Sequence, residues 1–89
     1  MTGTELISME RQRQINEEGY TIEGDQRYQL NQLAHAALSY LLTMDTNTKM
    51  PLVWPWTERY WKPEDRIKNL IKAGSLIAAE IDRLQSFIK

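Results

Sequence analysis

The chain has 89 residues, one histidine, no cysteine and a formal net charge of -1 at pH 7. This length fits one domain with one core, which we take to span residues 1–89. The lack of cysteine excludes disulfides, thiolate chemistry and cysteine-based zinc sites, and the charge provides no overall basic field for duplex nucleic acid. We therefore expect a single domain held together by packing, with no metal and no cofactor.

The hydropathy pattern gives no sign of a membrane. No apolar run reaches the roughly 18 to 20 residues that span a bilayer. Residues 1–10 also lack the basic and apolar segments of a secretory signal, so we expect a cytoplasmic protein. A chain this short buries only about 60 to 65% of the surface that its unfolded state exposes, so a partner subunit would stabilise it.

The first predicted helix covers residues 4–18. Thr2 and Glu5 have capping-box spacing before it, and Gly19 suits its C-terminal end. Its apolar residues are sparse and share one face only loosely: Leu6, Ile7, Met9 and Ile15. The pattern predicts a helix that lies on the surface of a larger core.

The second predicted helix follows a glycine-rich turn that ends at Asp25, a residue suited to cap it, and extends to about Met44. Its apolar residues recur every three or four positions at Leu30, Leu33, Ala37, Leu41 and Met44, with Ala34, Leu38 and Leu42 beside them. So wide an apolar stripe predicts burial on more than one side.

The third predicted helix opens at Pro63-Glu64-Asp65, with the proline at the first helical position. Apolar residues then alternate three and four apart, as in a coiled-coil seam, at Ile67, Leu70, Gly74, Ile77, Ile81, Leu84 and Ile88. Gly74 indicates the close approach of another helix. A second strip, Ile71, Leu76 and Phe87, exceeds what one neighbour could cover, which predicts a homo-oligomer. The fold class is therefore all-α: a short first helix and two long antiparallel helices joined by a loop.

That loop, residues 45–62, contains every tryptophan of the chain, and prolines stiffen it. One interpretation is a ligand surface on which an indole stacks a planar base and a nearby cation holds phosphate. The residues assigned to it are Trp54, Trp56, Arg59, Trp61 and Lys62. The alternative is that the tryptophans lock the loop onto the helices as an auxiliary core, which is the commoner role of such rings.

Arg11 and Arg13 complete the predicted ligand site, with nearby acids to orient their guanidinium groups. The alternative is a solvated helix face with one weak ion pair between Arg13 and Glu17. His35 is a poor metal candidate without further ligands, and we expect it in a hydrogen-bonded core position. Glu80 and Asp82 are two residues apart and point in different directions, so we predict no catalytic residues and no enzyme.

Several segments together resemble a family of short phage and prophage proteins. The resemblance covers most of the chain and rests on Glu10-Arg11-Gln12-Arg13-Gln14-Ile15, Glu18-Gly19-Tyr20-Thr21, Trp54-Pro55-Trp56, Trp61-Lys62-Pro63 and the run from Lys72 to Arg83. The chain departs from the family at Gly24-Asp25-Gln26, where its members carry a histidine and two aspartates. Similar segments stand beside nucleotide-hydrolase-like regions in longer phage proteins.

The resemblance implies a protein that acts in the host cytoplasm without catalysis. By analogy with other small phage proteins, we expect it to sequester a nucleotide-like anion, such as a host-defence messenger, in a pocket between subunits. A second hypothesis is a protein-interaction module whose exposed aromatic loop binds and inhibits a host factor. A third is a metal-dependent helical nucleotide pyrophosphatase.

Overall fold

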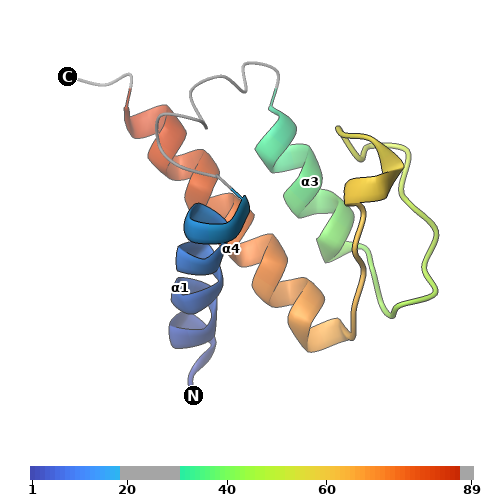
Figure 1. Cartoon of the computed structure of the whole chain (residues 1–89), viewed down its shortest axis with the longest axis horizontal. Coiled ribbons are helices and arrows are strands. Elements are labelled where there is room, and N and C mark those ends of the chain that lie inside the picture. Colours follow the sequence, from blue (N-terminus) through green and yellow to red (C-terminus); the bar gives the residue numbers. More distant parts are fainter. Residues whose placement is uncertain (19–30, 87–89) are drawn as a thin grey trace.

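The structure is a computed structural model that describes residues 1–18 and 31–86. Its elements are the helix α1 (Gly3–Arg13), the π-helical turn η1 (Gln14–Glu18), the helix α3 (Gln32–Leu41), the 3-10 turn η2 (Glu58–Tyr60) and the helix α4 (Arg66–Gln85). α4 packs against both α1 and α3, and α3 runs in the opposite direction to α4 (Figure 1). The described residues form helices and no strand, which confirms the predicted all-α, three-helix fold.

α1 begins with the predicted capping box. The Glu5 amide donates to the Thr2 hydroxyl oxygen at 3.2 Å, and the Thr2 amide donates to the Glu5 carboxylate at 3.1 Å. The helix starts at Gly3, one residue before the predicted start, and continues through η1 to Glu18. The predicted cap at Gly19 and the predicted turn that follows lie outside the described residues.

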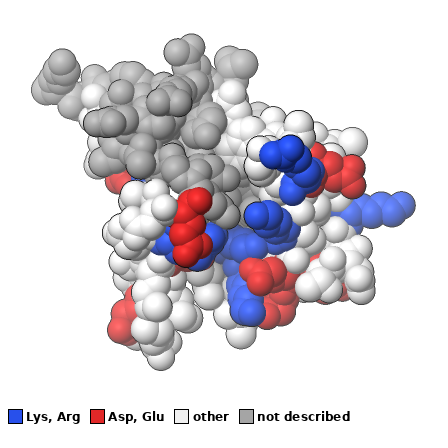
Figure 2. Space-filling view, in the orientation of Figure 1, with Lys and Arg blue, Asp and Glu red and all other residues white. Residues whose placement is uncertain are grey.

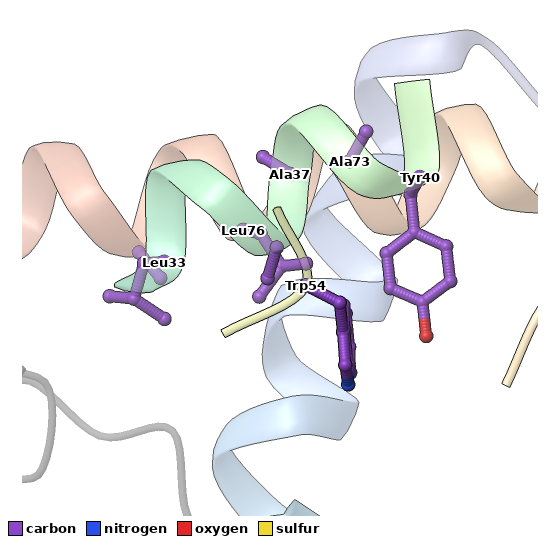
Figure 3. Packing of buried hydrophobic residues seen from close by; sticks show 8 residues of the cluster. Leu33, Ala37, Tyr40, Trp54, Ala73 and Leu76 are labelled. Carbon is purple, nitrogen blue, oxygen red and sulfur yellow. The ribbon is translucent and has the colours of Figure 1, made fainter. Parts of the chain in front are cut away.

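The core lies where α3, α4 and the long loop meet. It consists of Leu33, Ala36, Ala37 and Tyr40 of α3, Ala73, Leu76 and Ala79 of α4, and Trp54 of the loop. Figure 3 shows the ring of Trp54 beside that of Tyr40, next to the alanines of the two helices. Because alanine side chains are small, the backbones of α3 and α4 can come close together and still fill the space between them.

α3 is shorter than predicted. It ends at Leu41 rather than near Met44, and Arg66 of α4 donates hydrogen bonds to the carbonyl oxygens of Leu41, at 2.6 Å, and Thr43, at 3.1 Å. The guanidinium therefore satisfies carbonyl groups that the helix end leaves without an intrahelical donor. The predicted start of this helix, Asp25 and Leu30 included, lies outside the described residues.

α3 is buried on more than one side, against α4 and against the loop, but part of its predicted apolar stripe is exposed. Leu38, Leu41, Leu42 and Met44 are all exposed, while the buried positions are Leu33, Ala36, Ala37, Ser39 and Tyr40. Among the residues that the structure describes, α4 and the loop pack on adjacent sides of α3 and leave its opposite side uncovered. His35 lies on that uncovered side and is exposed, so its predicted core position was wrong.

α4 begins at Arg66 and not at Pro63. Asp65 is its N-cap, and the Asp65 carboxylate accepts a hydrogen bond from the Lys68 amide at 3.0 Å. Asn69 holds the preceding segment in place, because its side chain accepts from the Glu64 amide at 2.8 Å and donates to the Glu64 carbonyl oxygen at 2.7 Å. These bonds keep Glu64 outside the helix, which explains why the proline does not occupy the first helical position.

The predicted seam of α4 is exposed in this chain. Ile67, Leu70, Ile77, Ile81 and Leu84 have exposed fractions of 40 to 67%, and Ile88 lies outside the described residues. The face that packs in the core is instead Asn69, Ala73, Leu76, Ala79 and Arg83. None of the described helices has the length and apolar composition needed to cross a membrane.

Gly74 does meet a helix at close range, and the helix is α1. A Cβ atom at Gly74 would lie 2.6 Å from Cδ1 of Ile7. Arg11, also on α1, is buried and reaches Asp82 of α4, with 3.3 Å between the guanidinium nitrogen and the carboxylate oxygen. These contacts attach α1 to a side of α4 that α3 does not occupy, and they set the position of η1 beside the loop.

Candidate functional site

Two tryptophans of the loop are held against Tyr40 of α3. Trp61 stacks on the Tyr40 ring at a centroid distance of 4.8 Å, and Trp54 meets the same ring edge-on at 5.6 Å. The indole nitrogens donate to loop carbonyl oxygens, that of Trp54 to Thr57 at 3.2 Å and that of Trp61 to Thr48 at 3.5 Å. Both rings therefore have the position that the auxiliary-core interpretation describes.

Trp56 is placed differently from the other two. Its ring is only partly buried and meets Trp54 edge-on, with 5.3 Å between the centroids. Trp54 is buried to 8% exposure and so holds Trp56 against the core. Trp61 is also partly buried, but of these two indoles it is Trp56 that lines the cleft described next.

A cleft of about 560 Å³ lies between α1 with η1 on one side and the loop on the other. Its lining residues are Glu10, Arg13, Gln14, Glu17, Tyr40, Trp54, Trp56, Tyr60, Lys62, Lys72 and Leu76. Sites for small molecules commonly have volumes of about 300 to 1,000 Å³ and combine aromatic walls with a few polar groups. An adjoining groove of about 760 Å³ shares Glu10, Arg13, Lys62 and Lys72 with the cleft.

Charged groups of both signs surround the cleft. Figure 2 shows acidic and basic side chains together near the middle of this face, between α1 and the loop. The cations are Arg13, Lys62 and Lys72, and the carboxylates are Glu10 and Glu17. The lining is thus suited to a ligand that carries both negative charge and hydrogen-bond donors.

The two carboxylates hold Arg13. Its guanidinium donates to both carboxylate oxygens of Glu10, at 2.7 and 2.6 Å, and to Glu17 at 3.2 Å. The Arg13–Glu17 pair expected from their spacing is therefore present, with Glu10 as the closer partner. Because Glu10 and Glu17 already fix the guanidinium, the Arg13 side chain would lose little further conformational entropy when a ligand binds.

The two lysines lie where the cleft and the groove meet. The Lys72 ammonium donates to the Lys62 carbonyl oxygen at 2.6 Å, pairs with Glu64 at 2.8 Å, and lies 5.2 Å from the Tyr40 ring centroid. The Lys62 amide is fixed by the Tyr40 hydroxyl oxygen at 3.3 Å. No ion pair links the Lys62 ammonium to a carboxylate among the residues that the structure describes, so this cation is available for a ligand.

The π-helical turn shapes the wall opposite the loop. Gln14, the first residue of η1, is 2% exposed, and its amide nitrogen donates to the Ser75 hydroxyl oxygen at 2.9 Å and to Glu10 at 3.2 Å. The Ser75 hydroxyl itself donates to the Lys72 carbonyl oxygen, which fixes the orientation of the Gln14 amide. Turns of this kind are rare in proteins and are frequent at functional sites.

The seven predicted ligand residues divide into two groups. Arg13, Trp54, Trp56 and Lys62 line the cleft, although they come from separate segments of the chain. The other three lie elsewhere: Arg11 is buried beside Asp82, Arg59 lies 4.8 Å from the Tyr60 ring on the surface, and Trp61 packs on Tyr40. The cleft is thus formed by residues of one chain.

Other lining residues gave no signal in the sequence. Tyr40 and Lys72 are one aromatic and one cation on the core helices, and only the packing of α3 on α4 brings them to the loop. Gln14 looked like part of a solvated helix face, but the turn into η1 directs it toward Ser75. Only Glu10 and Glu17 had a recognisable signal, their spacing around Arg13.

Within residues 1–18 and 31–86, no group of three histidine, aspartate or glutamate side chains lies close enough to hold a metal ion. Glu80 pairs with Arg83 at 2.6 Å and Asp82 with Arg11 at 3.3 Å, so the two acids face different partners. No protein-family model, no curated protein and no solved structure matches this chain. Function is accordingly inferred from the residues of the cleft.

Proposed function

We propose that this protein binds, without catalysis, a nucleotide-like anionic small molecule in the cleft between α1 with η1 and the tryptophan loop. The observation that carries the proposal is the convergence of Arg13, Trp56 and Lys62 on one cleft from distant parts of the sequence. A partly buried indole, an ammonium group without an ionic partner among the described residues, and a guanidinium held by two carboxylates meet there. A planar ring system with polar substituents and a phosphate would use all three.

The base is assigned to Trp56 and the adjacent cleft wall. Stacking on an aromatic side chain contributes about 1 to 3 kcal/mol per base and accepts any nucleobase. Glu17 can accept hydrogen bonds from the amino groups of a base, because an ionised carboxylate is an acceptor only. Glu17 is exposed and bound to Arg13 through a single nitrogen, so its other lone pairs are free to accept.

The phosphate is assigned to the junction of the cleft and the groove. Lys62 and Lys72 both line this junction. The hydrogen bond from the Lys72 ammonium to the Lys62 carbonyl oxygen holds the two residues next to each other. Hydrogen bonds between an ammonium group and a phosphate are about twice as strong as neutral ones. The adjoining groove leaves room for a second nucleotide unit or a longer phosphate chain.

The resemblance to short phage proteins supports a role in the host cytoplasm, where sequestering a nucleotide messenger would protect a phage from host defence. The protein-interaction alternative draws on a different surface. Leu52 of the loop is fully exposed and Tyr60 is 49% exposed, whereas Trp54 is buried and Trp56 and Trp61 are partly buried. A host factor would therefore meet Leu52 and Tyr60 first, and binding of a protein but of no nucleotide would favour this function.

A native mass spectrum of freshly purified protein tests the proposal, followed by calorimetry of the ligand-free protein with AMP, GMP, cyclic di-GMP and inorganic phosphate. We expect a retained mass in the nucleotide range, or saturable binding of at least one nucleotide that is tighter than binding of phosphate. Failure of every nucleotide to bind, with no retained mass, would contradict the proposal. Magnesium-dependent conversion of a bound nucleotide would favour the hydrolase hypothesis instead.

A further inference from the structure

α3 and α4 carry an apolar surface whose exposed residues do not line the cleft. We name it the back face and define it by seven exposed side chains, Leu38 and Leu41 of α3 with Ile67, Leu70, Ile77, Ile81 and Leu84 of α4. Their exposed fractions lie between 39 and 67%. We propose that two copies of this chain associate through their back faces, so that each copy keeps a complete, outward-facing cleft.

Helical geometry places these residues together. Along α4 they are three, four or seven residues apart, which keeps them on one stripe, and Ala73, Leu76 and Ala79 on the other side of the helix are buried in the core. On α3, Leu38 and Leu41 are likewise turned away from the buried Ala36 and Tyr40, which lie toward the loop. α3 and α4 pack side by side, and in the proposed dimer both stripes contribute to the contact.

The composition of the stripe indicates a permanent contact. Its positions on α4 from Ile67 to Leu84 carry only isoleucine and leucine, apart from Gly74, which Ile7 of α1 covers at the border of the stripe. Surfaces of transient partners carry polar groups among the apolar ones, whereas the interfaces of obligate homodimers resemble a domain core. The three-and-four alternation is also the spacing with which one helix packs against an identical helix.

The back face would supply the apolar centre of an interface with a second copy, and the residues around it the remaining area. Seven half-exposed leucine and isoleucine side chains present on the order of 500 Å² of apolar surface, while a stable interface buries about 800 Å² on each partner. The neighbouring Ala34 and Ala78, both partly exposed, add to the area. Two helices from each copy would then form a four-helix arrangement, the usual way in which a helix pair covers an apolar face.

The cleft and the back face have no residue in common. The residues of α3 and α4 that line the cleft are Tyr40, Lys72 and Leu76, and Tyr40 and Leu76 belong to the face that packs toward the loop. A second copy on the back face therefore contributes no residue to the cleft. Association and ligand binding are independent properties in this arrangement, and either can fail without the other.

Sedimentation velocity of the full chain tests the association. We expect the unchanged protein to sediment as a dimer and Ile81→Glu to sediment as a monomer, with a dissociation constant raised by at least about tenfold. Ile81 is already 49% exposed in one copy, so the helix content measured by circular dichroism should not change. Leu52→Glu is the matched control, because Leu52 is fully exposed but lies in the loop, and it should remain a dimer.

Cross-linking supplies a second measurement. The chain has no cysteine, so Ile77→Cys introduces a single thiol at the middle of the stripe. In a twofold dimer a residue at the middle of the contact meets its own copy whether the helices run parallel or antiparallel. A short bis-maleimide should therefore link Ile77→Cys into dimers and leave Leu52→Cys largely unlinked.

A monomeric unchanged protein at high micromolar concentration would overturn the proposal, as would dimers of Ile81→Glu or equal cross-linking of the two cysteine variants. Nucleotide affinity is measured on the same samples. Ile81→Glu should bind as tightly as the unchanged protein, so loss of the dimer with binding intact separates this inference from the proposed function. Loss of binding in Ile81→Glu, with its helix content kept, would contradict the assignment of a complete cleft to each copy.

Discussion

Ile7 of α1 packs directly over Gly74 of α4, so closely that a Cβ atom at position 74 would lie 2.6 Å from Cδ1 and 2.9 Å from Cγ1 of Ile7. This contact places α1 beside α4 and so places one wall of the cleft. Because Cγ1 lies next to the branched Cβ of isoleucine, the side chain cannot avoid the added atom by moving its end alone.

We therefore expect Gly74→Ala to lower the free energy of unfolding by about 1 kcal/mol, because overpacking outweighs the gain in helix propensity. In an Ile7→Ala background Gly74→Ala should instead raise the free energy of unfolding. The Ile7 side chain no longer meets the added Cβ atom there, and alanine is a better helix former than glycine. Urea denaturation of the four proteins measures both effects. A stabilising Gly74→Ala in the unchanged background would show that α1 does not pack as described.

Asn69 is expected to be the most sensitive polar residue of the core. It is completely buried and donates to the carbonyl oxygens of Thr43, at 3.1 Å, and Glu64, at 2.7 Å. Asn69→Asp would replace the donating amide nitrogen by a carboxylate oxygen, which would face both carbonyl oxygens without a hydrogen. We expect a loss of about 2 to 4 kcal/mol in the free energy of unfolding. Asn16→Asp on the exposed side of η1 is the control and should change it by less than about 0.5 kcal/mol. Equal effects of the two variants would contradict the assigned role of Asn69.

The capping box predicts a pH effect at the start of α1. The pKa of Glu5 is lowered, first because its carboxylate accepts a hydrogen bond from the Thr2 amide and second because it accepts one from the Thr2 hydroxyl. A carboxyl group whose pKa is lower in the folded state stabilises that state above its ordinary pKa, and this contribution is lost as the pH falls through the lowered value. NMR titration of the Glu5 carboxyl carbon should show the lowered pKa, and Thr2→Ala should raise it partway. An ordinary pKa in the unchanged protein would rule out the capping box.

Arg11 is expected to act on stability and not in the ligand site. Its side chain is buried between α1 and α4, whereas the Asp82 side chain beside it is 40% exposed. Arg11→Ala should lower the free energy of unfolding by about 1 to 2 kcal/mol through lost packing and the lost ion pair, and Asp82→Ala should lower it less. Chemical denaturation compares the two variants. A larger effect of Asp82→Ala would show that the ion pair, and not the packing of the arginine stem, attaches α1.

The sequence predicted much of the fold because helix ends and periodic apolar residues follow local rules. The capping box of Thr2 and Glu5 forms as predicted, and the three helices lie in the predicted order. The buried face of α4 was missed because the pattern of isoleucine and leucine marks a different stripe. Packing against α3 instead uses Ala73 and Ala79, whose small size permits close approach but gives a weak hydrophobic signal.

The candidate site was predicted in part for a similar reason. A tryptophan-rich loop indicated an aromatic surface, but which of its partly buried indoles lines the cleft depends on tertiary packing, since Trp61 stacks on Tyr40 instead. Arg11 and Arg13 looked equivalent in sequence, yet a two-residue step along a helix turns one side chain toward Asp82 and the other toward the cleft. Lys72 could not be predicted as a site residue, because only the packing of α3 and the loop on α4 brings it to the cleft.

Calorimetry of three variants decides whether the cleft binds a nucleotide-like anion. Lys62→Ala removes the ammonium at the junction, Trp56→Ala removes the partly buried indole of the cleft, and Arg59→Ala removes a cation of the same loop that lies outside the cleft. With the nucleotide that binds the unchanged protein best, Lys62→Ala and Trp56→Ala should each weaken binding by roughly tenfold or more, and Arg59→Ala by less than about threefold. Equal affinities in all three variants, or a larger loss in Arg59→Ala than in Lys62→Ala, would contradict nucleotide binding in this cleft.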